Sequence, residues 1–137
     1  MVDVSAKPVQ RRKAVAAGEI RLQKSTLALI RKNALAKGNV LATARLAGIL
    51  AAKKTGELIP LCHPLPIAHC EVCFEIPPTR DRIAIRASAK IAAQTGVEME
   101  ALTAVVAAAL TIYDMCKAVD KKMRITNVRL ISKTKRG

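Results

Sequence analysis

The sequence predicts an α+β fold in which an antiparallel β-sheet carries helices packed on one face. Two runs, residues 67–76 and 82–92, alternate apolar and polar side chains around a Pro-Pro turn, the pattern of a β-hairpin. Two helical segments precede this hairpin, and one long apolar helix follows it. With a strand at each end of the chain, the order is β-α-α-β-β-α-β, which is typical of a ferredoxin-like sandwich.

The first strand and the first helix are expected in the basic N-terminal segment. Residues 2–23 alternate weakly between apolar and polar side chains, so we expect extended structure with a bend near Gly18. Ser25 can then cap a helix over residues 26–35, because its hydroxyl can accept a hydrogen bond from a free N–H group of the first turn.

The second helix is expected over residues 40–54. Asn39 is its predicted cap, and Gly56 is placed to end it. A loop at residues 58–66 follows and holds three prolines around His63. A residue before proline is restricted to extended geometry, so this loop should present His63 to a ligand with little loss of entropy. A plain proline-rich connector is the alternative interpretation.

The hairpin leads into the longest helix. Gly96 precedes it, and residues 97–119 are apolar nearly all round, which indicates a buried helix. A last strand is expected over residues 123–132, followed by a basic tail.

The composition indicates the size of the domain, the assembly of the protein and its location in the cell. The chain has 137 residues, enough for a single domain over residues 1–137 with its own core. Its 24 alanines, one Tyr, one Phe and no Trp predict a core of small side chains, and we therefore expect subunit contacts to add stability in a homo-oligomer. No signal sequence is visible at Met1, and the longest nearly uncharged run, residues 101–113, is shorter than the ~20 residues of a membrane span. We expect a cytoplasmic protein with no membrane partner.

A net charge of +14 indicates a polyanionic partner. The positive charge is concentrated in residues 1–38, with nine Lys and Arg against two acids, and in residues 117–137, with eight against one. The two aromatic rings of the chain are too few for the stacking that single-stranded nucleic acid requires. A small phosphorylated ligand is favoured. A basic module that binds duplex nucleic acid through its phosphates is the alternative, and a solvated basic surface with no specific partner also stays open.

The cysteines raise a zinc alternative. Cys62, His63, His69 and Cys70 are the residues that would supply the ligands. Against this reading, no second Cys-x-x-Cys pair is present, and the alternating strand places Cys70 and Cys73 on opposite faces. We expect no metal site.

Candidate acid–base residues occur on the long helix. Asp114 and Lys117 are three residues apart and share a face. They are expected to be buried, either as a structural ion pair or as an acid–base couple in which desolvation lowers the pKa of the lysine. Lys37, just before the second helix, adds an ammonium near a helix N-terminus, which suits a phosphate. Glu100 lies 14 residues before Asp114, about 21 Å along the axis, so a site that uses both needs a neighbouring subunit.

Five segments, in order along essentially the whole chain, match a known family. They are VDVS (2–5), KGNVLATAR (37–45), IPLCHPL (59–65), TGVEMEALT (95–103) and IYDMCKAV (112–119). They closely resemble the molybdenum cofactor biosynthesis protein C family of cyclic pyranopterin monophosphate synthases. The resemblance implies a lyase that converts (8S)-3′,8-cyclo-7,8-dihydroguanosine 5′-triphosphate to cyclic pyranopterin monophosphate with release of pyrophosphate, an early step of molybdenum cofactor (molybdopterin) biosynthesis. It also implies a homohexamer, a trimer of dimers with active sites shared between subunits, and no cofactor, with Mg²⁺ on the triphosphate left open.

The resemblance implies roles for individual residues. The essential lysines of the family correspond to Lys37 and Lys117, and its active-site aspartate corresponds to Asp114. Its substrate contacts correspond to Leu61, Cys62, His63, Met99 and Glu100, with Arg12 and Lys133 near the triphosphate.

The chain departs from the family pattern at three places. Asn39 stands where the family usually has Asp, which keeps a helix cap but removes a charge. Ala93-Gln94 replaces a Gly-Lys pair, so a phosphate contact from that lysine is lost. The tail Lys135-Arg136-Gly137 replaces a glycine-rich end. None of these departures involves the expected catalytic residues.

Overall fold

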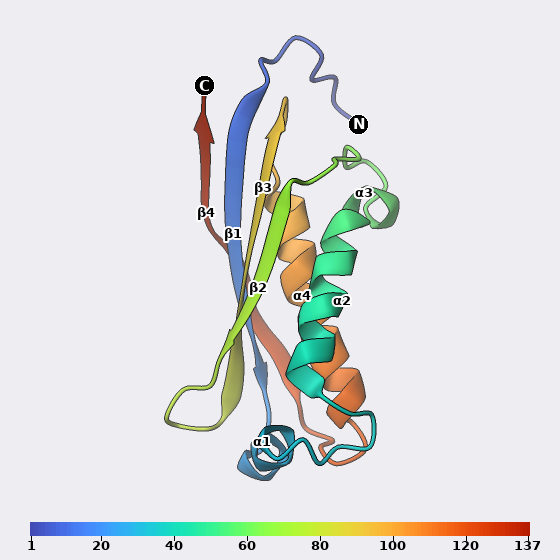
Figure 1. Cartoon of the computed structure of the whole chain (residues 1–137), viewed down its shortest axis with the longest axis vertical. Coiled ribbons are helices and arrows are strands. Elements are labelled where there is room, and N and C mark those ends of the chain that lie inside the picture. The colour runs from blue at the N-terminus through green and yellow to red at the C-terminus, as the bar shows by residue number, and fades with distance from the viewer.

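The fold is an antiparallel sheet of four strands with its helices on one side. A computed structural model describes every residue from Met1 to Gly137. Figure 1 shows helices α2 and α4 lying side by side against the sheet, with α1 beneath its lower end. The elements are β1 (Gln10–Arg21), α1 (Lys24–Arg31), α2 (Val40–Lys53), α3 (Thr55–Leu58), β2 (His69–Glu75), β3 (Arg82–Ala93), α4 (Glu98–Cys116) and β4 (Arg124–Arg136).

The strand order confirms the predicted α+β, ferredoxin-like class. The order across the sheet is β2-β3-β1-β4, and every pair of neighbours is antiparallel. Strands β2 and β3 form the expected hairpin, in which His69 lies opposite Lys90. The bend expected near Gly18 corresponds to a shift in the register of β1 against β4. The short helix α3 adds one turn that the sequence pattern does not predict.

The last strand is longer than expected. We predicted a strand over residues 123–132 followed by a basic tail, but β4 continues to Arg136. The additional residues pair with the start of β1, so that Lys133 lies opposite Ala14 and Lys135 lies opposite Arg12. Their side chains are polar because no helix covers this end of β4, so the apolar alternation that marks a half-buried strand is absent.

The core is built from small side chains between α4, α2 and the sheet. Ten buried alanines contribute to it: Ala14, Ala16, Ala44, Ala52, Ala87, Ala89, Ala101, Ala104, Ala108 and Ala109. Gly48 of α2 faces α4 so closely that a Cβ atom there would lie 2.9 Å from the carbonyl oxygen of Ala104. Small residues therefore let the two helices approach each other, while α4 packs over the middle of the sheet. Helix α4 is also long and apolar enough to span a bilayer, and 50% of it is buried inside this fold, as in the core helix of a globular protein.

The two ends of α1 differ from the prediction. Ser25 does not cap the helix; the N-cap residue is Gln23, and its backbone N–H donates to the Asp120 carboxylate. The helix ends at Arg31 rather than near residue 35, because Asn33 adopts a left-handed conformation with φ of 53°. The N–H of Ala34 then donates to the carbonyl of Leu29, which closes a Schellman motif.

The ends of α2 give one confirmed prediction and one that is wrong. The Asn39 side chain accepts a hydrogen bond from the N–H of Ala42 at 3.0 Å, as expected of a cap. Gly56 does not end the helix, which already stops at Lys53. Gly56 instead lies in α3, where a Cβ atom would collide with the backbone of Pro64. A glycine is therefore needed where α3 packs against the proline loop.

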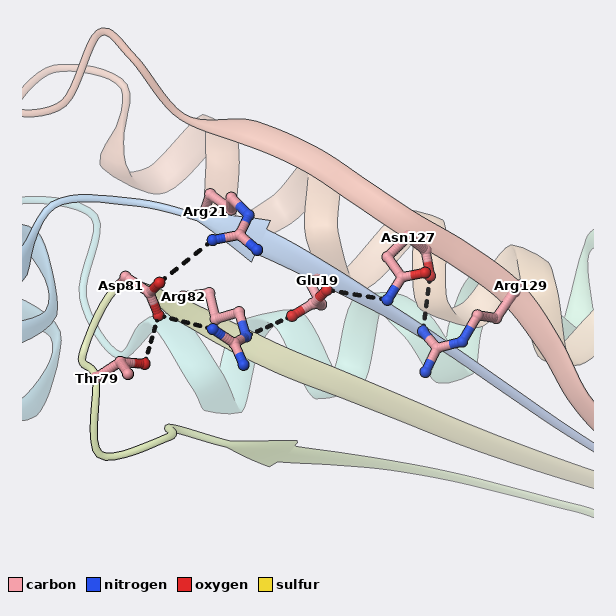
Figure 2. Close-up of polar contacts among 7 residues, drawn as sticks. All are labelled: Glu19, Arg21, Thr79, Asp81, Arg82, Asn127 and Arg129. Atoms are coloured by element: carbon pink, nitrogen blue, oxygen red, sulfur yellow. Dashed lines mark hydrogen bonds and ion pairs between the residues drawn. The ribbon is translucent and has the colours of Figure 1, made fainter.

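A network of ion pairs fastens the hairpin turn to the neighbouring strands (Figure 2). The Arg82 guanidinium contacts both Asp81 and Glu19, and Arg21 contacts Asp81 from β1. Asn127 of β4 donates to Glu19 at 3.1 Å and thereby joins the third strand to the network. The lower end of the sheet is thus held by charge pairs, whereas its upper end carries unpaired basic side chains.

Candidate active site

Three charged side chains meet at the C-terminal end of α4. Asp114 lies in the last turn and Lys117 directly after it, while Lys37 lies in the loop before α2. The Nζ of Lys37 donates to Asp114 Oδ2 at 2.7 Å, and the Nζ of Lys117 lies 3.1 Å from Asp114 Oδ1. Gly38 has a φ of 101°, a left-handed conformation that favours glycine, and turns the chain into α2. The structure therefore brings together the three residues expected to be catalytic.

The two ammonium groups keep the Asp114 carboxylate charged. The hydrogen bond from Lys37, followed by that from Lys117, lowers the pKa of Asp114 below its ordinary value. We expected this group to be buried, and for the single chain that was wrong: the side chain of Asp114 is 53% exposed. In the single chain, water therefore reaches all three side chains of this cluster.

The proline loop and the start of α4 enclose a cavity of about 350 Å³. Its lining contains four expected substrate contacts, Leu61, Cys62, His63 and Met99, together with Ile59, Leu65, Thr95, Gly96 and Glu98. The His63 ring donates through Nε2 to the carbonyl oxygen of Val2 at 2.7 Å, which fixes the ring in the tautomer that leaves Nδ1 free to accept. A mostly apolar recess with one oriented imidazole suits a small ring system.

A second cavity, of about 310 Å³, adjoins the first and is strongly basic. Its lining contains Lys7, Arg12, Lys13, Thr95, Gly96, Val97, Glu98, Lys133, Thr134 and Lys135. The Arg12 guanidinium is fixed by hydrogen bonds to the carbonyl oxygens of Ala93 and Gln94, at 3.1 and 3.2 Å. The cavity lies at the N-terminus of α4, whose dipole adds further positive potential. Five cations against one carboxylate make this a site for a polyanion.

Sequence reasoning missed three of these cations, Lys7, Lys13 and Lys135. The available signal was the excess of positive charge at the two ends of the chain, which the antiparallel pairing of β1 with β4 brings to one place. Sequence reasoning also did not assign Glu98 to the lining of the cavities. Its carboxylate folds back over Gly96, where a Cβ atom would collide with it. Because Thr95, Gly96 and Glu98 line both cavities, the basic and the apolar recess form one continuous region.

Glu100 differs from the other expected contacts because it does not line either cavity. It is only 1% exposed, and its Oε1 has no hydrogen-bond partner. Burial, together with the nearby Glu98 carboxylate, raises the pKa of Glu100. The pKa of the Cys62 thiol is also raised, first by burial and then by Glu100 and Glu98. Glu100 is therefore a buried, unpaired carboxyl close to the cavity wall.

The two groups of site residues lie at opposite ends of α4. The recess lies at the N-terminal end of α4 and the Lys37–Asp114–Lys117 cluster at its C-terminal end. Figure 1 shows α4 running from the upper to the lower part of the molecule. The 14 residues from Glu100 to Asp114 correspond to about 21 Å of helix. One chain therefore cannot place both groups around one small molecule.

The residues considered as zinc ligands do not gather. No three His, Cys, Asp or Glu side chains lie close enough together to hold a metal ion. Strand β2 directs Cys70 toward the core and leaves Cys73 exposed, in agreement with their expected opposite faces.

Comparison with known proteins gives a consistent result. The model of the MoaC family matches residues 1–136. A cyclic pyranopterin monophosphate synthase of Chloroflexus aurantiacus is 59% identical over 133 residues, which are 97% of this chain and 82% of the relative. Cyclic pyranopterin monophosphate synthase 3 of Mycobacterium tuberculosis is 58% identical over 134 residues, 98% of this chain and 75% of that protein. A cyclic pyranopterin monophosphate synthase of Rhodospirillum rubrum is 54% identical over 134 residues, 98% of this chain and 81% of the relative.

Proposed function

The chain belongs to the MoaC family, and from this premise we infer that it is a cyclic pyranopterin monophosphate synthase. It is a lyase that converts (8S)-3′,8-cyclo-7,8-dihydroguanosine 5′-triphosphate to cyclic pyranopterin monophosphate and releases pyrophosphate in molybdenum cofactor biosynthesis. The observation that carries this conclusion is the pair of adjoining recesses at the start of α4: a basic one that fits a triphosphate and an apolar one that fits a fused ring.

We propose that the basic recess binds the triphosphate. Arg12 is prearranged by its two carbonyl contacts, so little side-chain entropy is lost when it binds a phosphate oxygen. Lys133 reaches the same recess from β4. No resident cofactor is required, and any Mg²⁺ would arrive with the triphosphate as part of the substrate. The ring system then occupies the neighbouring recess against Leu61, Cys62, His63 and Met99.

The proposed catalytic group is Lys37, Asp114 and Lys117. The carboxylate orients both ammonium groups, and either ammonium can give a proton to a reacting nitrogen or oxygen atom. In the closing step, a substrate hydroxyl oxygen forms a bond to the α-phosphorus while the bond from that phosphorus to the bridging oxygen breaks. The hydroxyl proton passes to the lysine that gave its own proton to a reacting atom in an earlier step, and pyrophosphate leaves with the bond's electron pair.

We further propose that each site is completed by a second subunit. An apolar stripe runs along the outer face of α4 through Met99, Val106, Leu110 and Tyr113, each between 36% and 55% exposed. These residues are spaced by seven, four and three positions, which places them on one helix face. Antiparallel packing of two such stripes would place the Lys37–Asp114–Lys117 cluster of one chain beside the recess of the other, and would desolvate the cluster.

This pairing fits the charges at the two ends of the helix. Glu98 marks the N-terminal end of α4, and Lys117 and Lys121 mark its C-terminal end. An antiparallel pair would therefore set the Glu98 carboxylate of one chain against these lysines of the other, and would leave the five cations of the recess to the triphosphate. The proposal extends to a hexamer built as a trimer of such dimers, located in the cytoplasm, with neither a membrane nor a nucleic acid as partner.

The decisive experiment is incubation of the purified chain with the cyclised guanosine triphosphate. We expect cyclic pyranopterin monophosphate by mass spectrometry and one equivalent of pyrophosphate per product. An Asp114→Asn chain is the matched control, since it keeps the shape of the side chain but removes the charge that holds both lysines. Formation of neither product by the parent chain would refute the proposed function.

A further inference from the structure

A buried carboxylate three residues after Lys117 binds the start of helix α1, from which the chain leads to Lys37. We propose that Asp120 is a positioning residue that sets the placement of Lys37 relative to Lys117. The proposal rests on the proposed function, because it assumes that these two lysines act together. Asp120 touches neither lysine; it acts through the backbone segments that bear them.

The contacts of Asp120 join the turn after α4 to the first turn of α1. Its Oδ2 accepts a hydrogen bond from the backbone N–H of Gln23 at 2.9 Å and another from the hydroxyl of Thr26 at 2.8 Å. Its Oδ1 accepts from the N–H of Lys122 at 3.1 Å, and its own N–H donates to the carbonyl oxygen of Cys116. Asp120 is 2% exposed and Thr26 is 1% exposed. One buried side chain thus connects residues that are 94 and 97 positions apart.

Helix α1 depends on this contact because it has no side-chain cap of its own. Its N-cap residue, Gln23, makes no capping hydrogen bond with its side chain, and no acidic residue stands in its first turn. From across the fold, Asp120 accepts a hydrogen bond from the N–H of this N-cap residue and brings a negative charge to the N-terminus of the helix. The chain then runs through α1 and the Schellman motif to Lys37, so the placement of that lysine begins at the Asp120 contact.

The direct contact between Lys37 and Asp114 is too exposed to hold the segment unaided. Their side chains are 52% and 53% exposed, and exposed ion pairs of this kind contribute little to stability. The Asp120 contacts are shielded from water and charge-assisted, which makes them stronger. Burial alone would raise the pKa of Asp120, but the hydrogen bonds from Gln23, Thr26 and Lys122 outweigh it and lower the pKa. The group is therefore ionised at neutral pH.

The test compares an Asp120→Asn chain with a Val72→Ala chain. Val72 is 1% exposed in β2 and lies outside both groups of site residues, so its truncation destabilises the fold without touching them. Each variant is assayed at a temperature equally far below its own Tm. We expect kcat to fall about 10- to 100-fold in Asp120→Asn with KM nearly unchanged, because a displaced lysine affects the reacting atoms and not the triphosphate recess. Val72→Ala should keep the parent kcat.

A second readout does not depend on turnover. The carboxyl group of Asp114 can be titrated by carbon NMR in folded protein, and its low pKa reports whether Lys37 and Lys117 are in place. In Asp120→Asn this pKa should rise toward the ordinary value of ~3.9, whereas Val72→Ala should leave it unchanged. An unaltered Asp114 pKa in a folded Asp120→Asn chain would overturn the proposal.

Thr26 provides a milder pair of variants in case Asp120→Asn does not fold. Thr26→Val removes one hydrogen bond to Asp120 at nearly constant volume, and Thr26→Ser retains the hydroxyl. We expect a raised Asp114 pKa and a lowered kcat in Thr26→Val only. Equal behaviour of the two variants would count against the positioning role. If the parent chain forms no product, the proposed function fails, but the Asp114 titration still decides whether Asp120 positions the lysines.

Discussion

The two ends of α4 carry charge in opposite ways. At the N-terminal end, five cations line a recess that holds the single carboxylate of Glu98, so a large positive excess remains. At the C-terminal end, two lysines share the carboxylate of Asp114 on an open surface. The first arrangement has walls and four positive charges in excess, while the second has one positive charge in excess and no walls.

This difference indicates that the N-terminal end of α4 is suited to binding an anion, and that the C-terminal end is not yet suited to proton transfer. A walled recess with unpaired cations is already complete as a site for an anion, because the ligand supplies the missing negative charge. An exposed charge cluster is poorly suited to proton transfer, because water screens its interactions and solvates the lysines. Under the proposed function, the C-terminal end would need a covering partner, and antiparallel packing of α4 would supply one.

The largest expected effect is on turnover at the C-terminal end. Lys117→Arg keeps the positive charge but cannot release a proton at usable pH, so kcat should fall by roughly 10²- to 10⁴-fold with little change in KM. Lys37→Arg tests whether the other lysine shares this role or only binds charge. Steady-state kinetics of both variants measures the difference. Near-normal turnover in both would leave the lysines as charge clamps and remove the acid–base interpretation.

The next test concerns the separation of the two ends. Arg12→Ala and Asp114→Asn chains should each be inactive or nearly so, since each lacks one group of the site. If sites are shared across a two-fold pair, refolding an equal mixture should restore roughly a quarter of the parent activity, because half of the random pairs contain one intact site of two. Subunit exchange is verified by native mass spectrometry with one chain isotopically labelled. No recovery despite proven exchange would place both groups in one chain.

A smaller effect is expected at the N-terminal end. Lys133→Ala should raise KM about 10-fold and leave kcat nearly unchanged, because one charge-assisted contact to the triphosphate is lost and the acid–base group is intact. Inhibition by added pyrophosphate should weaken in parallel. Lys54→Ala, a change at an exposed lysine after α2, is the matched control for loss of one charge. A fall in kcat at constant KM would show that the recess does more than bind.

The smallest expected effect is on stability. The folded state raises the pKa of Glu100, so ionisation of this group favours the unfolded chain at any pH above the ordinary Glu value of ~4.3. Glu100→Gln should therefore raise the Tm by a few degrees at pH 7, and the difference should shrink as the pH falls toward 4. Thermal unfolding monitored by circular dichroism across this range is the measurement. A Tm difference of the same size at all pH values would mean that ionisation of the Glu100 carboxyl is not its cause.

Much of the fold follows from patterns that act over a few residues. Alternation in β2 and β3, the long apolar run of α4 and the Asn39 cap each depend on near neighbours, and each was predicted. The early end of α1 was not, because a left-handed Asn33 is one of several conformations that its sequence permits. The length of β4 was not predicted either, since its last residues are held by pairing with a distant strand and carry no apolar alternation.

The sequence by itself determined the order of the elements, the family and the identity of the catalytic candidates. Only the tertiary structure decided that Lys37 reaches Asp114 across 77 residues, that five cations from both ends of the chain share one recess, and that Asp120 caps a helix 97 residues away. The physical reason is the distance along the chain over which each effect acts. Backbone propensities and side-chain periodicity act within a turn or two of the chain, whereas charges meet through space, wherever strand pairing and helix packing bring them together.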